Sequence, residues 1–273
     1  PEGSAQIVTR LTVTWSGVVA GGKPRTRADM MAEVSSRLPQ LVGGLRGTGA
    51  GMAVRACTAQ EIIDHTRAAY DPSAAADIEE ARAEGGTGLH WDEAGPSALD
   101  VGYDMLRHDG AYSMSWQMAA PPRGVVYSVS MAELLLPHRQ IDRKRVTLLY
   151  RPENPVNSAQ AVEQDINLAL WSASNQRRPS ARVQADIAAA RKTAQEEALG
   201  AALVRFGMIV TATVSDPAGL PLARQTVESL SATARLHLRP AYGNQDVAFL
   251  AGLPLGVILP KMTILPSELR EML

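Results

Sequence analysis

The stretch from Ser180 to Ser215 constrains the fold of this chain more than any other part. In its first half, apolar side chains recur every three or four residues, which is the spacing of one face of an α-helix. Ser180 favours the start of that helix and Gly207 its end. Ile209 to Val214 is β-branched and apolar, which predicts a central strand. Because the apolar face is mostly alanine, we expect the helix to lie flat across a sheet that contains this strand. The face comprises Val183, Ile187, Ala190, Ala194, Ala198 and Ala201.

Composition sets limits on the class of protein. The 273 residues allow one large or two modest domains, and 45% hydrophobic content is enough for a core. The net charge of −1 predicts no overall attraction to nucleic acid or to acidic lipid. A single cysteine, Cys57, excludes an internal disulfide, and no apolar run is long enough to span a bilayer. Since the sequence opens at Pro1 with no leader, we expect a soluble piece of a longer chain.

The first half predicts helices and strands joined by an acidic excursion. Residues 5–18 alternate apolar and polar side chains and predict a strand with one buried face, followed by a helix over 27–45, a glycine-rich turn and a short strand over 52–55. Thr58 and Glu61 form a capping box for a helix that ends at Tyr70. Residues 71–98 read as a long acidic surface loop, functional or disordered, with a short helix at 77–83. A strand at 111–119 and a strand or helix at 126–136 follow.

The second half alternates strands and helices more clearly. Strands are predicted at 144–150, 209–214 and 235–238, and helices at 157–171, 220–234 and 245–253 besides the long one. This order predicts a split βαβ, ferredoxin-like arrangement. We therefore expect an α+β fold with mixed, mainly antiparallel sheets and packed helices. The predicted subdomains are 1–140, which holds the acidic loop, and 141–273.

Gly17 to Lys23 matches the glycine and lysine spacing of a phosphate-binding loop. In such loops the next residue is Ser or Thr, because its hydroxyl holds the magnesium ion. Here Pro24 takes that place and also removes a backbone amide that would face the phosphate. We interpret the segment as a turn between a strand and a helix.

No other residue set in the sequence has the spacing of a catalytic or metal site. The five histidines are scattered, and Cys57 has no neighbouring base. Glu163, Asp165 and Asp186 fall on helix positions typical of solvent faces. We therefore predict no catalytic residue, no metal, no cofactor and no small-molecule substrate.

Three segments of the second half say most about function. They are KRVTLLYRPENPVNSAQAVEQDINLAL, AQEEALGAALVRFGMIVTATVSD and LPLARQTVESLSATARLHLRPAYGNQDVAFLAGLPLG. They resemble the amino-terminal domain of the VirB-type conjugation ATPases of type IV secretion systems. The resemblance is closer to the related membrane-anchored conjugation proteins of Gram-positive mobile elements, some of which lack a motor domain. RACTAQEIIDHTRAAYDP is similar to the short strand, helix and Tyr-Asp-Pro of the same family.

The resemblance implies a role in assembly rather than catalysis. In the family the nucleotide-binding half follows the closing Leu-Pro turn, whereas seventeen residues follow Gly256 here, so ATPase activity is not carried over. It implies association with further copies and with membrane components of the channel, on the cytoplasmic side. We expect a non-catalytic scaffold module of a conjugation or type IV secretion machine.

Partner contact is predicted in the closing segment, residues 242–260, which is more apolar than one helix requires. The alternative is that Phe249 and Leu253 are ordinary core. The residues proposed for partner contact are Tyr242, Gln245, Phe249, Leu253 and Pro254.

Two other functions remain open from the sequence. One is a nucleic-acid-binding accessory domain that contacts transferred DNA through Arg143, Lys144 and Arg145. The other is the regulatory amino-terminal half of a truncated secretion ATPase. A metal-dependent hydrolase built on the acidic loop would need ligands that the sequence does not offer.

Overall fold

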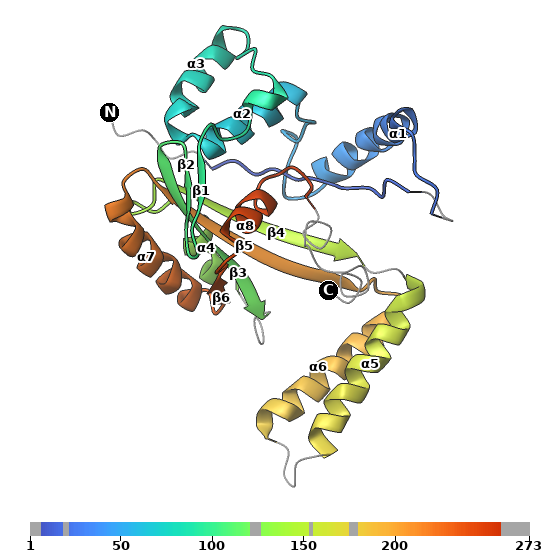
Figure 1. Cartoon of the computed structure of the whole chain (residues 1–273). Helices are drawn as coiled ribbons and strands as arrows, with labels where there is room; N and C mark the ends of the chain where they lie inside the picture. Colours follow the sequence, from blue (N-terminus) through green and yellow to red (C-terminus); the bar gives the residue numbers. More distant parts are fainter. Residues whose placement is uncertain (1–6, 19–21, 121–126, 153–154, 175–179, 258–273) are drawn as a thin grey trace. The chain divides into compact units, whose positions relative to one another are not determined.

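The computed structural model describes residues 7–18, 22–120, 127–152, 155–174 and 180–257 (Figure 1). It confirms the predicted α+β class, with helices and a six-stranded, mostly antiparallel sheet. None of the helices in these ranges is both long and apolar enough to cross a membrane. The longer helices are α1 (Arg27–Arg46), α2 (Ala59–Tyr70), α3 (Ala75–Glu84), α4 (Ser128–Leu135), α5 (Pro155–Ser174), α6 (Ala181–Ala198), α7 (Leu220–Thr233) and α8 (Gln245–Ala251).

The sheet joins strands from both halves of the sequence. The strand order is β1-β2-β3-β5-β4, and β6 pairs with β3. β3 pairs antiparallel with β5, where Tyr112 lies opposite Val214 and Gln117 opposite Ile209. The strands are β1 (Leu99–Val101), β2 (Leu106–His108), β3 (Ala111–Ala120), β4 (Arg143–Pro152), β5 (Val204–Val214) and β6 (His237–Pro240).

This topology corrects two expectations. The second half does not form a sheet of its own. β5 and β6 both pair antiparallel with β3, on its opposite edges, because Gln117 lies opposite both Ile209 and Arg239. β5, α7 and β6 therefore form a split βαβ unit, but the strand between β5 and β6 comes from the first half. The compact units are also not 1–140 and 141–273. One unit contains residues 1–147 and 209–273, and the other, which we call the arm, contains residues 148–208. The pairing of β3 with β5 and β6 ties the two sequence halves into the first unit.

The two faces of the sheet differ in chemistry. On one face Met114, Trp116 and Val210 are buried, and α7 packs against β3 there. On the other face the buried side chains are hydroxyls: Ser113 bonds to Thr213 at 2.6 Å and Ser115 to Thr211 at 2.9 Å. Alternation along β3 and β5 sends neighbouring residues to opposite faces. The hydroxyl face meets α8, whose Gln245 bonds to the backbone of Ser115 (Figure 1).

The acidic loop predicted at 71–98 is folded onto α2. It contains a short 3-10 helix, then α3, which includes the helix predicted at 77–83, and a second 3-10 turn at Trp91–Glu93. Thr87 donates a hydrogen bond to buried Asp64 at 2.5 Å, and Gln60 of α2 bonds to both Thr87 and the Leu89 carbonyl. The predicted capping box of Thr58 and Glu61 is present at the start of α2.

Two strands predicted in the first half are absent from the residues that the structure describes. The described part of 5–18 and residues 52–55 have no strand pairing beyond an isolated bridge between Val18 and Pro24. Thr12 and Thr14 instead donate hydrogen bonds to the Pro254 and Gly256 carbonyls. Side chains at 7–18 stay largely exposed, so their alternation does not mark a buried face.

The structure of the arm differs from the prediction made for residues 180–215. α6 begins at the predicted Ser180 cap but ends at Ala198, because Gly200 takes a left-handed conformation with φ of 91°. Gly207 lies inside β5 rather than at a helix end. The partner of α6 is α5, so its alanine-lined stripe packs helix on helix rather than across the sheet.

Candidate functional site

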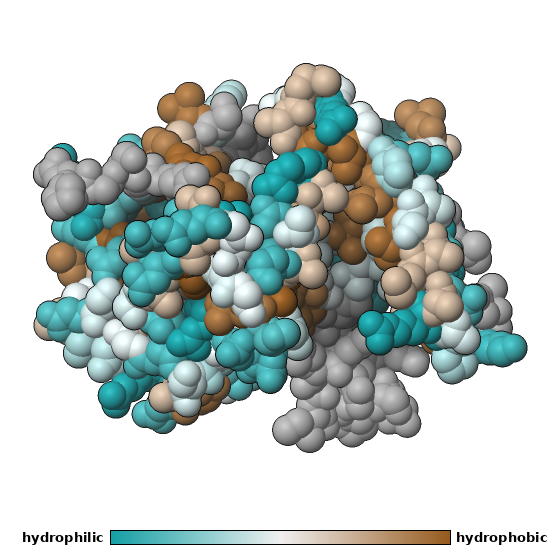
Figure 2. Space-filling model, turned by 90° about the horizontal axis from the view of Figure 1, so that it is seen from above, coloured by the Kyte–Doolittle hydropathy of each residue, from teal (hydrophilic) through white to brown (hydrophobic). Residues whose placement is uncertain are grey.

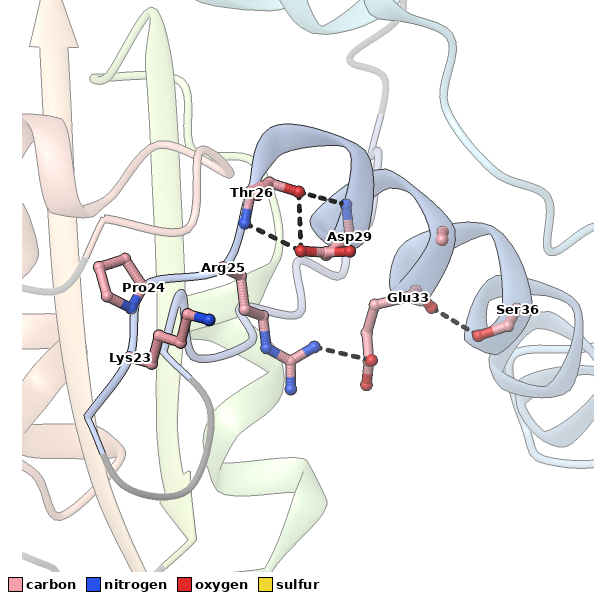
Figure 3. Close-up of a pocket in the computed structure, with 8 residues that line it drawn as sticks. Lys23, Pro24, Arg25, Thr26, Asp29, Glu33 and Ser36 are labelled. Carbon is pink, nitrogen blue, oxygen red and sulfur yellow. Dashed lines mark hydrogen bonds and ion pairs between the residues drawn. The ribbon is translucent and has the colours of Figure 1, made fainter.

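The segment that resembles a phosphate-binding loop is a small hairpin that leads into α1 (Figure 3). Its residues 19–21 lie outside the described ranges. Arg25 donates its backbone amide to the Gly17 carbonyl at 2.8 Å, and Pro24 bridges to Val18. The start of α1 is already capped, since Asp29 accepts from the Thr26 amide at 3.1 Å and from its hydroxyl at 2.7 Å. A carboxylate at the free amides of a helix opposes phosphate binding there.

An open hollow of about 680 Å³ beside this hairpin has an ion pair in its lining. Arg25 bonds to Glu33 at 2.7 Å (Figure 3). Glu33 also pairs with Arg37. Hydrogen bonding by Arg25 holds the pKa of the Glu33 carboxyl below its ordinary value. The groups that line this hollow therefore neutralise one another.

The residues predicted for partner contact divide into buried and exposed ones. Gln245, Phe249 and Leu253 are at most 2% exposed, so the core alternative stated for Phe249 and Leu253 holds. Phe249 packs in a cluster with Ala69, Leu106 and Leu253. Pro254 is half-buried, and its carbonyl accepts from Thr12 at 2.9 Å.

Tyr242 is the member of that set with an accessible ring. It is 38% exposed and stacks on Tyr103, with ring centroids 5.2 Å apart and planes at 10°. Arg224 bonds to the Tyr242 hydroxyl at 2.5 Å. This exposed aromatic pair is fixed in place and can accept a contact.

The basic residues predicted for nucleic acid point to different faces of β4. Lys144 donates to the carbonyls of Glu133 and, at 2.5 Å, Leu136 at the end of α4, where a cation complements the helix dipole. Arg143 donates to the Ala68 carbonyl in the last turn of α2 at 2.9 Å. Arg145 lies over the Phe249 ring at 4.7 Å. The three do not form one exposed basic row of the kind that follows a nucleic-acid backbone.

Sequence reasoning missed a serine and histidine that meet in the sheet. His108 Nε2 lies 2.7 Å from Ser113 Oγ, and His108 Nδ1 bonds to the Tyr70 carbonyl. Because a carbonyl only accepts, Nδ1 carries the proton and Nε2 accepts from Ser113. Both residues are 0% exposed, and burial is the main reason that the pKa of His108 is lowered. With no access for a substrate, this pair is a structural network rather than a nucleophile and base.

A signal for this network was present in the sequence. Asp109-Gly110 between two short apolar runs is typical of a tight hairpin, and such a turn brings His108 and Ser113 to one face of β2 and β3. Asp109 has a φ of 44°, as the turn requires. The five-residue spacing of His108 and Ser113 thus follows from the turn.

Among the described residues no group of three or more metal-ligating side chains comes together. Cys57 is exposed. Asp165 and Asp186, which were assigned to solvent faces, are exposed and line one groove of about 320 Å³ between α5 and α6.

The arm carries a high density of exposed apolar side chains. Figure 2 shows that hydrophobic residues on the face seen from above lie in separate patches among hydrophilic ones, so single exposed residues carry little information. In the arm, however, Trp171 is 67% exposed, Leu168 63% and Leu199 89%. On the paired strands β4 and β5, four further apolar side chains are exposed, namely Leu148, Tyr150, Val204 and Phe206.

Comparison with known proteins adds no relative. No family model, no curated protein and no solved structure matches this chain. Functional argument therefore rests on the side chains themselves.

Proposed function

We propose that this chain is a non-catalytic assembly module whose arm binds a second copy of the chain. The observation that supports this proposal is the set of large apolar side chains exposed on the arm, led by Leu168 and Trp171. These two residues lie three apart on α5, so they share one helix face. Apolar clusters of this kind are typical of protein-protein contact surfaces, and tryptophan is enriched at their centres.

Charge favours a second copy as the partner of the arm. Residues 148–208 contain six acidic and seven basic side chains, so two arms carry almost no net repulsion. α5 and α6 already pack as a helix pair, and two such pairs can combine into a four-helix arrangement.

The setting we propose is a conjugation or type IV secretion machine, on the cytoplasmic side of the membrane. Support comes from the sequence resemblance to the amino-terminal domain of VirB-type ATPases. Membrane components of the channel are the further partners proposed. The nucleic-acid alternative receives less support, because Arg143 and Lys144 are bonded to helix carbonyls.

Sedimentation velocity over a range of concentrations tests the self-association. We expect the wild-type chain to form dimers or larger species and the Leu168→Ser, Trp171→Ser double variant to remain monomeric. A matched control is Leu99→Ser with Val101→Ser, which removes two exposed apolar residues from β1 in the other unit. A monomeric wild type, or equal losses in both double variants, would reject the arm as the contact surface.

A further inference from the structure

Arg145 is a partly buried cation without a hydrogen-bond acceptor among the described residues. Its Nε and Nη2 are shielded from solvent and unpaired, and its guanidinium carbon lies 4.7 Å from the Phe249 ring centroid. Burial lowers its pKa to about 10, and no carboxylate is among the groups that offset this. A guanidinium removed from water without an acceptor is costly, and native structures usually provide a partner. Contact with one aromatic face leaves the donors at the edge of the fork unused.

Two more arginines, Arg143 and Arg10, lie on β4 and on the amino-terminal segment. Arg143 is two residues away on the same face of β4, and it uses one nitrogen for the Ala68 carbonyl. Arg10 comes from the amino-terminal segment, which is held near the closing turn by Thr12 and Thr14. Glu61 acts on Arg10, but that carboxylate is already paired with Arg55 and Arg82. Arg143 therefore adds a second positive charge close enough to act on Arg145.

The pKa of His65 of α2 is sensitive to the charges of these arginines. Burial, followed by the charges of Arg10, Arg145 and Arg143, lowers its pKa to about 3. The three arginines thus lie close enough to act on one imidazole, although they come from segments far apart in the sequence. His65 is neutral near pH 7 and adds a ring nitrogen to the same place.

We propose that a phosphate group binds at Arg145, with Arg143 beside it on the same face of β4 and His65 of α2 nearby. A guanidinium fork matches the oxygen spacing of phosphate and binds it in a bidentate manner. The shielded position of Arg145 fits a single compact oxyanion and not the continuous backbone of DNA. All of these residues belong to the first unit, so this site is independent of the arm and of the proposed self-association.

Titration calorimetry of the full chain with inorganic phosphate tests the site. We expect saturable binding, at least about tenfold weaker in Arg145→Lys, which keeps the charge and loses the fork. Arg139→Met is the matched control, since Arg139 is exposed on the loop before β4, and its binding should equal that of the wild type. No saturable binding at millimolar phosphate, or equal binding in Arg145→Lys, would overturn the proposal.

Nuclear magnetic resonance of His65 gives a second readout that a purely structural arginine would not change. Phosphate neutralises the arginines, so the pKa of His65 should rise when phosphate is added, and an imidazolium signal should grow at about pH 5. Arg145→Lys should remove most of this phosphate dependence. A His65 signal that does not respond to phosphate would count against the site.

Two further ligands distinguish a lipid headgroup and a nucleic acid from free phosphate as the natural ligand of this site. Tighter binding of dioctanoyl phosphatidic acid than of inorganic phosphate would assign the site to a lipid headgroup, and equal binding would assign it to free phosphate. Oligothymidylate that binds more tightly than both, with a loss in Lys144→Ala as well, would overturn the compact site in favour of a nucleic-acid surface.

Discussion

The sheet unit and the arm treat their apolar residues in opposite ways. Within the described ranges the arm buries two hydrophobic residues, Val162 and Met208, and exposes eight large ones. The sheet unit buries apolar side chains on both faces of its sheet, including Trp116, Phe249 and Val227, each at most 1% exposed. A region that exposes more large apolar side chains than it buries gains little stability from its own packing. This difference is what we expect if the sheet unit supplies stability and the arm, as we propose, supplies a surface for a partner.

The largest effect is expected from removing an aromatic ring in each region. Phe249→Ala should lower the free energy of unfolding by about 3–5 kcal/mol, because Phe249 is fully buried between Tyr70, His108 and Arg145. Trp171→Ala in the arm should change it by less than about 0.5 kcal/mol. Urea denaturation of both variants measures the contrast, and equal losses would remove the distinction between the two regions.

The free energy of unfolding should change with pH by a few kcal/mol because of His65 in the sheet unit. The pKa of His65 is about 3 in the folded chain and ordinarily 6.5, so the unfolded chain binds the extra proton between these values. The contribution of His65 is fully present above pH 6.5 and is lost as the pH falls toward 3. Urea denaturation from pH 7 to 4 should show stability falling with pH, less steeply in His65→Gln. An unchanged slope in His65→Gln would contradict this assignment.

A smaller loss is expected from the hydroxyl face of the sheet. Ser113→Ala removes the donor to His108 Nε2 and leaves that buried nitrogen unpaired, which should cost about 1–3 kcal/mol. Ser174→Ala in the arm is the control, because Ser174 is exposed and bonds only to the Trp171 carbonyl. Thermal unfolding compares the two, and a neutral Ser113→Ala would show that the network contributes little.

The smallest of these effects concerns the capping box of α2. Thr58→Ala should cost about 1 kcal/mol, since it frees the Glu61 amide, whereas Thr58→Ser should keep the cap. Denaturation midpoints of the two variants measure this, and identical midpoints would show that other contacts fix the start of α2.

Elements with local signals could be predicted from the sequence. The capping box fixed both the start and the type of α2, and the alternation at 111–119 matched β3. The unit boundaries could not be predicted, because they follow from the pairing of β3 with β5 and β6 across about a hundred residues. The predicted end of α6 at Gly207 was wrong, because Gly200 takes the left-handed conformation that ends the helix.

The candidate sites depended still more on long-range contacts. Arg143, Lys144 and Arg145 were singled out by charge, but only the fold shows that Lys144 meets α4 while Arg145 lies over Phe249. His65 gave no signal in sequence, because Arg10, Arg143 and Arg145 approach it from two other segments. Burial of Phe249 decided between the two alternatives stated for it.

Position-specific photo-cross-linking tests the assembly role of the arm most directly. A photoreactive phenylalanine analogue at position 171, in the full chain, should give a covalent dimer on illumination at micromolar concentration. The same analogue at Tyr103, which is 70% exposed in the sheet unit, should give none. No dimer from position 171, or equal dimer from both positions, would contradict the proposal that the arm binds a second copy of the chain.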